Sequence, residues 1–302
     1  MSPQALPTKK NSRRPSKFTL VAGLIGAALF APLTASASMV AYDGFEYNIS
    51  GGAGLAGKGS AGDGWDTTWS GSGTIVEDNM TYSAGTIAVN GGSQSLRING
   101  NAEVYFSRQF ETIGTAGEDI YFSFLFKEVT GGTDDFLNFW ISHDADRSNS
   151  AGIGVLTTSY RRFGARIHEN GTTSTGTQTG PNYVAGDTYL LVGRISRDGT
   201  AGATPTIFDR VDLWVNPESS TLGAADITIN YSSLVEDSVG MSFFGLHTTN
   251  VAGGDIRIDE LRIGTSAAGV LSTIPEPSSY AVIFGGVALL CGLRRRHTPR
   301  VR

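Results

Sequence analysis

Apolar and polar residues alternate along much of the chain between residues 40 and 270, and this pattern predicts short β-strands. The runs are separated by clusters of Gly, Asn, Asp and Ser, which favour turns. The clearest predicted strands lie at 95–98, 103–110, 119–129, 136–142, 162–169, 188–196, 206–216, 226–230, 240–248 and 255–264. No stretch here keeps a 3.6-residue apolar period over three turns, so the crossover helices of a parallel α/β sheet are missing.

Short strands joined by turn residues are typical of an antiparallel β-sandwich or jelly roll. In the run 103–110, alternation places Phe106 and Arg108 on one side and Tyr105 on the other. Two segments lack strand character: the Gly-rich stretch 50–73 and the Thr- and Gly-rich stretch 169–187, which we expect to be a polar loop. We predict one all-β sandwich over residues 38–268, followed by a linker at 269–274.

The first 37 residues have the three parts of a secretory signal peptide. Basic residues up to Lys17 precede an apolar run at 18–33, and Ala35 and Ala37 supply the small residues that signal peptidase requires. We expect cleavage after Ala37. The pair Arg13-Arg14 could also mark a twin-arginine signal, but Pro15-Ser16 replaces the apolar residues expected after it, so ordinary secretion is favoured.

The last 28 residues, 275–302, read as a processing signal rather than as part of the fold. Pro275, Glu276 and Pro277 precede an apolar segment at 280–293, which ends at Arg294, Arg295 and Arg296. The apolar segment is shorter than the roughly 17 residues that a spanning helix needs. The three arginines place its end on the cytoplasmic side. We expect a short transmembrane helix that holds the chain only transiently.

Composition limits the partners of the exported body. Residues 38–274 contain 13 Lys and Arg against 27 Asp and Glu, a net charge of −14, which argues against nucleic acid as a partner. The acidic surface serves solubility or, alternatively, attracts calcium or a polycationic partner. The single cysteine, Cys291, lies in the C-terminal apolar segment, so the body has no disulfide, thiolate metal site or cysteine nucleophile.

The order Pro-Glu-Pro, apolar segment and arginine cluster resembles the PEP-CTERM sorting tail of exported bacterial proteins. This resemblance implies recognition by a membrane exosortase and a place on the cell surface or in the exopolysaccharide biofilm matrix of a Gram-negative bacterium. The body resembles the concanavalin A-like, laminin-G-type jelly rolls that are often fused to this tail. That resemblance rests on the segments AYDGFEY (41–47), GDGWDTTW (62–69), YLLVGRI (189–195), VDLWVNP (211–217) and DELRIG (259–264).

Glucanases of this fold class carry two glutamates around an aspartate on one strand, which aim a nucleophile and an acid into one cleft. The nearest match is the segment 255–260, where Asp255 and Asp259 share a face but Glu260 points away. His143, His168 and His247 are isolated, and the G-x-S-x-G elbow of a serine hydrolase is missing. The sequence therefore favours a non-enzymatic, glycan-binding role, with a polysaccharide-active hydrolase or lyase and a purely structural matrix component as alternatives.

Two groups of residues are candidates for ligand contact. Trp65 and Trp69 either stack on sugar rings or form a hydrophobic plug that closes the sandwich, and the plug is favoured because aromatic side chains usually bury their area. Asp144 and Asp146 open a segment that resembles the start of a calcium loop, but Asn149 and Val155 replace the Gly and Glu that an EF-hand requires. We favour a polar turn there and expect no cofactor other than, at most, calcium.

Overall fold

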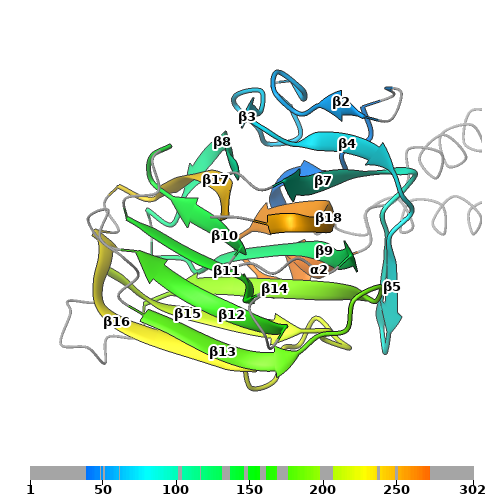
Figure 1. Cartoon of the computed structure of the whole chain (residues 1–302). Coiled ribbons are helices and arrows are strands. Elements are labelled where there is room, and N and C mark those ends of the chain that lie inside the picture. The colour runs from blue at the N-terminus through cyan, green and yellow to red at the C-terminus, as the bar shows by residue number, and fades with distance from the viewer. Residues whose placement is uncertain are drawn as a thin grey trace, which may run out of the picture. The chain divides into compact units, whose positions relative to one another are not determined.

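Two large antiparallel β-sheets packed face to face form most of the described part of the chain, so the predicted all-β sandwich is confirmed (Figure 1). The computed structural model describes residues 39–47, 49, 52–60, 62–100, 104–115, 117–130, 137–145, 149–156, 161–168, 176–197, 207–236, 239–248 and 251–272. The signal peptide and the sorting tail predicted from sequence lie outside these ranges.

The larger sheet has nine strands, and its strand order places the first and last strands of the sandwich side by side in the middle. Along the sheet run β16 (Ile227–Glu236), β15 (Ile207–Val215), β14 (Thr188–Ser196), β9 (Ile120–Thr130), β18 (Val251–Gly264), β7 (Gln94–Gly100), β4 (Thr74–Glu77) and β2 (Ala53–Gly54), while β1 (Met39–Asp43) also pairs with β18. The register aligns Met39 with Gly264 and Asp43 with Leu261.

The smaller sheet has seven strands and supplies the other wall of the core. Its order is β13 (Gly176–Asn182), β12 (Arg162–His168), β11 (Ser150–Leu156), β10 (Leu137–Ser142), β17 (Met241–Thr248), β8 (Val104–Ile113) and β3 (Ser70–Gly71). Alternate residues of both sheets meet in one apolar core, in which the rings of Phe124 and Phe139 lie 4.3 Å apart between centroids. Burial of this apolar area is the main force that holds the two sheets together.

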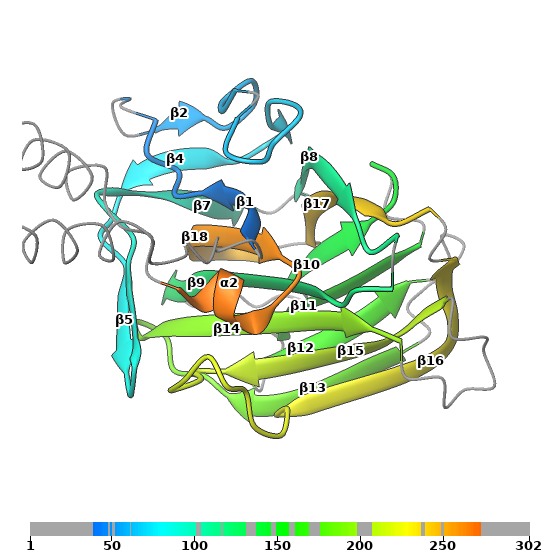
Figure 2. The same ribbon diagram turned by 180° about the vertical axis from the view of Figure 1, so that it is seen from behind.

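The outer face of the nine-stranded sheet is covered as well. The hairpin of β5 (Thr81–Ala84) and β6 (Ile87–Asn90) and the short helix α2 (Ala267–Leu271) form a second apolar cluster with residues of β9, β14 and β15 (Figure 2). This explains why β9 is buried on both faces from Phe122 to Phe126. Ser266 caps α2 by accepting a hydrogen bond from Gly269 N, and Ser123 Oγ donates to Val270 O.

Each of the ten predicted strands overlaps a strand of the structure, but the two segments expected to lack strands, 50–73 and 169–187, contain some, and the short strands β2 and β3 lie in the first of them. The prediction of a polar loop over 169–187 is wrong for residues 176–182, which form β13. Its β-branched threonines suit a strand, and Pro181 is tolerated because β13 is an edge strand. Helix α2 lies across the expected boundary between sandwich and linker at residue 268, so ordered structure continues to Ser272.

Candidate functional site

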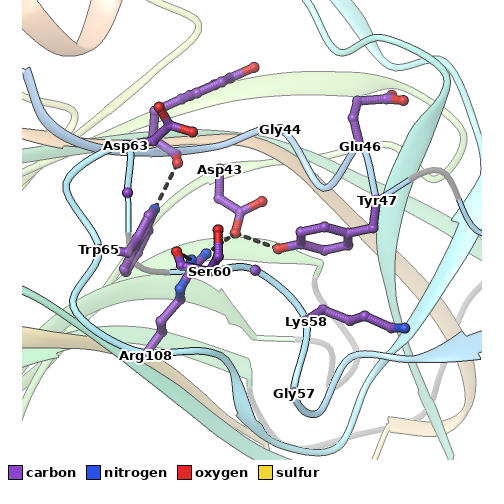
Figure 3. A pocket seen from close by; sticks show the side chains of 13 residues that line it. Asp43, Gly44, Glu46, Tyr47, Gly57, Lys58, Ser60, Asp63, Trp65 and Arg108 are labelled. Atoms are coloured by element: carbon purple, nitrogen blue, oxygen red, sulfur yellow. Dashed lines mark hydrogen bonds and ion pairs between the residues drawn. The ribbon is translucent and has the colours of Figure 1, made fainter.

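A pocket of about 530 Å³ opens where β1, the loop between β2 and β3, and β8 meet (Figure 3). We call it the rim pocket. Its walls carry both signs of charge, several hydroxyl groups and glycine backbone. The lining residues are Tyr42, Asp43, Gly44, Glu46, Tyr47, Gly57, Lys58, Gly59, Ser60, Gly62, Asp63, Trp65 and Arg108.

The pocket is built from segments far apart in the sequence, because β1 pairs with β18 and the loop 55–65 folds back over β1. Tyr42 N donates to Asp63 O at 3.0 Å, and Trp65 Nε1 donates to Tyr42 O at 2.7 Å. Gly64 has a positive φ of 83°, and a Cβ there would lie 1.5 Å from Val40 O, so only glycine allows this close approach. Two of the segments that carry the jelly-roll resemblance, 41–47 and 62–69, thus meet at this site.

Asp43 and Arg108 form a buried ion pair at the base of the pocket, with side chains 5% and 3% exposed. Arg108 Nη1 donates to Asp43 Oδ2, Nε donates to Thr67 O at 2.9 Å, and Nη2 donates to Ser60 O at 3.0 Å. The guanidinium lies 4.4 Å from the centre of the Trp65 ring, within range of a cation–π contact. Burial lowers the pKa of Arg108, and the neighbouring Asp43 carboxylate opposes that change.

Asp43 has donors around both carboxylate oxygens, so it is fixed in place. Phe45 N donates to Oδ1 at 2.8 Å, and Tyr47 Oη and Trp69 Nε1 donate to Oδ2 at 2.5 and 2.8 Å. Burial raises the pKa of Tyr47, and the negative charge of the Asp43 carboxylate raises it further. The phenol therefore stays protonated and can donate its hydrogen bond. Because these donors and Arg108 already occupy both oxygens of the Asp43 carboxylate, the group has a structural role in the pocket.

Three charged groups of the pocket remain outside this ion pair. Glu46 is exposed and accepts hydrogen bonds from Ser93 N, from Ser93 Oγ at 2.9 Å and from Gln94 N at 2.7 Å. Asp63 is exposed and Lys58 is half-buried, and neither makes a side-chain hydrogen bond or ion pair with the described residues. Asp63 and Lys58 can therefore contact a ligand without first breaking an internal bond, whereas Glu46 already accepts three hydrogen bonds.

A second polar cluster lies next to the pocket on β18. A bulge between Asp259 and Arg262 gives Glu260 a positive φ of 54°. Glu260 accepts from Tyr42 Oη at 2.6 Å and from Arg262 Nη2 at 2.5 Å. Asp259 is fully buried, and its Oδ1 accepts from Glu260 N at 2.8 Å, while its Oδ2 has no hydrogen-bond partner among the described residues. The pKa of Asp259 is raised to about 10, mainly by burial and secondly by repulsion from the Glu260 carboxylate.

The comparisons with known proteins give no family for this chain. No family model and no curated protein matches it. Among solved structures it is similar to the exoplasmic/lumenal domain of VIP36 in a Ca²⁺/Man3GlcNAc-bound form (14% identity, 67% of this chain, 88% of that chain, TM-score 0.39). It is also similar to the Emp47p carbohydrate recognition domain (10% identity, 72% of this chain, 95% of that chain, TM-score 0.41). A third similar structure is the carbohydrate-binding module CBM66 from Bacillus subtilis (14% identity, 65% of this chain, 94% of that chain, TM-score 0.38). The fold of this chain is defined by its own strand arrangement.

The two tryptophans singled out in the sequence are buried, with Trp65 3% and Trp69 1% exposed. Their rings lie 5.6 Å apart between centroids, and Trp69 contacts Phe45, Phe106 and Phe244. This is the arrangement expected of the plug. Stacking of a sugar on either ring would require the covering side chains, Arg108 among them, to move.

The other candidate residues do not converge on one site in the described part of the chain. Asp144 Oδ2 lies 3.1 Å from His143 Nε2, and its Oδ1 lies 3.2 Å from Ser142 Oγ, while Asp146 is outside the described residues. Asp255 pairs with Arg97 and Arg257, and Asp259, which was expected to share its face, is fully buried. No group of three or more acidic, His or Cys side chains in the described ranges could hold a metal ion.

The predicted processing residues belong to the two ends of the sequence. Ala35 and Ala37, Pro275 to Pro277 and Arg294 to Arg296 lie outside the described ranges. Within those ranges, no helix is long and apolar enough to span a membrane.

Sequence reasoning missed the rim pocket, although one signal for it was present. Arg108 occupies an inward position of a strand whose neighbouring inward residues, Phe106 and Phe110, are fully buried. A charged residue at such a position demands a buried partner. The partner, Asp43, is 65 residues away in the sequence, and no local pattern identifies it.

Proposed function

We propose that the chain is an exported protein of the cell surface or extracellular matrix whose β-sandwich binds glycan in the rim pocket without catalysing a reaction. The observation that carries this proposal is the set of uncommitted polar groups in the pocket. The Asp63 carboxylate can accept hydrogen bonds, and the Lys58 ammonium and the Ser60 hydroxyl can donate them. A ligand rich in hydroxyl groups needs both kinds of partner close together, with few polar groups left unpaired.

Binding is favoured over hydrolysis because two of the three carboxylates of the pocket are already held by internal hydrogen bonds. A glycosidase needs two carboxyl groups that are free to act as acid, base or nucleophile. Asp43 is held by Arg108 and by three further donors, and Glu46 by two backbone N–H groups and a hydroxyl. Only Asp63 is left without such bonds among the described residues. One free carboxylate supports recognition better than acid–base catalysis.

Blocking the pocket tests the binding proposal. The change Ser60→Trp places a large ring at the mouth of the pocket while leaving the Ser60 carbonyl bonded to Arg108. We expect the wild-type protein to bind at least one polysaccharide class on a glycan array and Ser60→Trp to lose that binding. The matched control is Ser83→Trp at an exposed serine of β5, which should bind normally. Running the array with and without EDTA tests calcium, and binding by Ser60→Trp equal to that of wild type would contradict the proposal.

The sorting proposal concerns the two ends of the chain and has its own test. The signal peptide would be removed after Ala37, and an exosortase would cleave near Pro275-Glu276-Pro277 after the apolar segment has held the chain in the membrane. Mass spectrometry of the extracellular protein should therefore find a chain that begins near Ser38 and ends close to this motif. An extracellular chain that still ends at Arg302 would contradict processing by an exosortase.

A further inference from the structure

We propose that the rim pocket selects a glycan that carries protonated amino groups, such as a deacetylated amino-sugar polymer, over neutral and uronic-acid glycans. This inference rests on the proposed function and adds the chemical class of the ligand. The inference rests on the charged side chains of the pocket that are not part of an internal ion pair.

The paired charges contribute little to ligand choice. Arg108 is bonded to Asp43 and to two carbonyl groups, so all three of its nitrogens already have acceptors. Behind Tyr42, the Glu260 carboxylate is paired with Arg262 in the same way. Tyr42 and Tyr47 remain neutral, because burial and an adjacent carboxylate raise the pKa of each phenol.

The uncompensated charges of the pocket are mainly negative. Glu46 and Asp63 are both exposed on its wall, and Glu46 has only neutral donors as partners. Lys58 is the cation that opposes them, and Figure 3 shows its side chain directed away from Asp43 and Asp63. A protonated amine would therefore enter a site of opposite charge, whereas a carboxylate on the ligand would enter one of like charge.

The field of the whole body acts in the same direction. The net charge of −14 over residues 38–274 attracts a polycation from a distance and repels a polyanion. This long-range contribution is screened by salt, because the Debye length falls from about 30 Å at 0.01 M to about 10 Å at 0.1 M ionic strength. Selection by charge should therefore be strongest at low salt.

Three hexasaccharides of equal length separate the ligand classes: glucosamine, N-acetylglucosamine and galacturonic acid oligomers. Calorimetry with the purified full-length protein at low salt should give at least about tenfold tighter binding for the glucosamine oligomer than for the other two. Raising the salt concentration should reduce that difference. The change Asp63→Asn should weaken binding of the glucosamine oligomer about tenfold, consistent with loss of a charged hydrogen-bond acceptor.

The matched control is Asp66→Asn, which removes an exposed carboxylate of the same loop that does not line the pocket. It should change the affinity less than twofold. Equal or tighter binding of the acetylated or uronic-acid oligomer, or equal effects of the two substitutions, would overturn the selection for amines while leaving glycan binding intact. Failure of all three oligomers and of the glycan array would instead overturn the proposed function.

Discussion

Replacement of Arg108 by methionine is expected to lower the free energy of unfolding by about 3–5 kcal/mol, the cost of breaking a buried ion pair by removing one partner. The substitution leaves the Asp43 carboxylate buried without its cation and removes the acceptor-bound nitrogens that hold the loop carbonyls of Ser60 and Thr67. Urea denaturation should show a lower midpoint with an unchanged slope if folding stays two-state.

Two comparisons separate loss of the pair from loss of any arginine. Arg97→Met removes a more exposed partner of Asp255, with a side chain that is 35% exposed, and should cost less than about 1 kcal/mol. The double change Asp43→Asn with Arg108→Met should recover part of the loss, because no unpaired charge remains buried. Equal costs for Arg108→Met and Arg97→Met would show that the buried pair contributes little to stability.

The change Asp259→Asn is expected to stabilise the protein at neutral pH. The pKa of Asp259 is about 10 in the folded state, against about 3.9 in an unfolded chain, so the folded state binds a proton that the unfolded state has released at pH 7. The contribution of this group to stability is therefore fully present below about pH 4 and is lost progressively as the pH rises towards 10. At pH 7 the cost is up to about 4 kcal/mol, at 1.36 kcal/mol for each pH unit above 3.9.

Asparagine is neutral at every pH and nearly the same size as aspartic acid, so it should remove this dependence. Urea midpoints measured from pH 4 to pH 9 should decline less steeply for Asp259→Asn than for the wild type. The control is Asp66→Asn, which changes an exposed carboxylate and should keep the wild-type slope. Parallel profiles for wild type and Asp259→Asn would mean that Asp259 is not the group responsible.

Local sequence patterns predicted most strands of the fold but not the residues of the rim pocket. The strands at 119–129 and 188–196 were found because their apolar runs are long and are bounded by turn residues. Strand β1 was not predicted, because residues 39–43 are short and gain their place only by pairing with β18. The bulge that turns Glu260 towards Tyr42 does have a local signal, because the apolar positions shift from 256 and 258 to 261 and 263 across the consecutive acidic residues Asp259 and Glu260.

The residues of the rim pocket could not be predicted from local sequence patterns either. Its charged groups come from β1, from the irregular loop 55–65 and from β8, so no spacing in the sequence relates them. The alternation in 103–110 did place Arg108 beside Phe106 on one face, and the structure confirms that this face is buried. What the sequence could not supply was the partner across the sandwich.

The pairing of β1 with β18 also bears on how the protein reaches its folded state. Met39 lies opposite Gly264, so β1 cannot take its place until β18 has been synthesised, and the centre of the sheet cannot close before then. Contacts between residues so far apart in sequence make folding slow, because the entropy of closing the long loop is lost before the stabilising contacts form. The core therefore stays incomplete until β18 is available for pairing. The topology thus couples synthesis of β18 to the onset of cooperative folding.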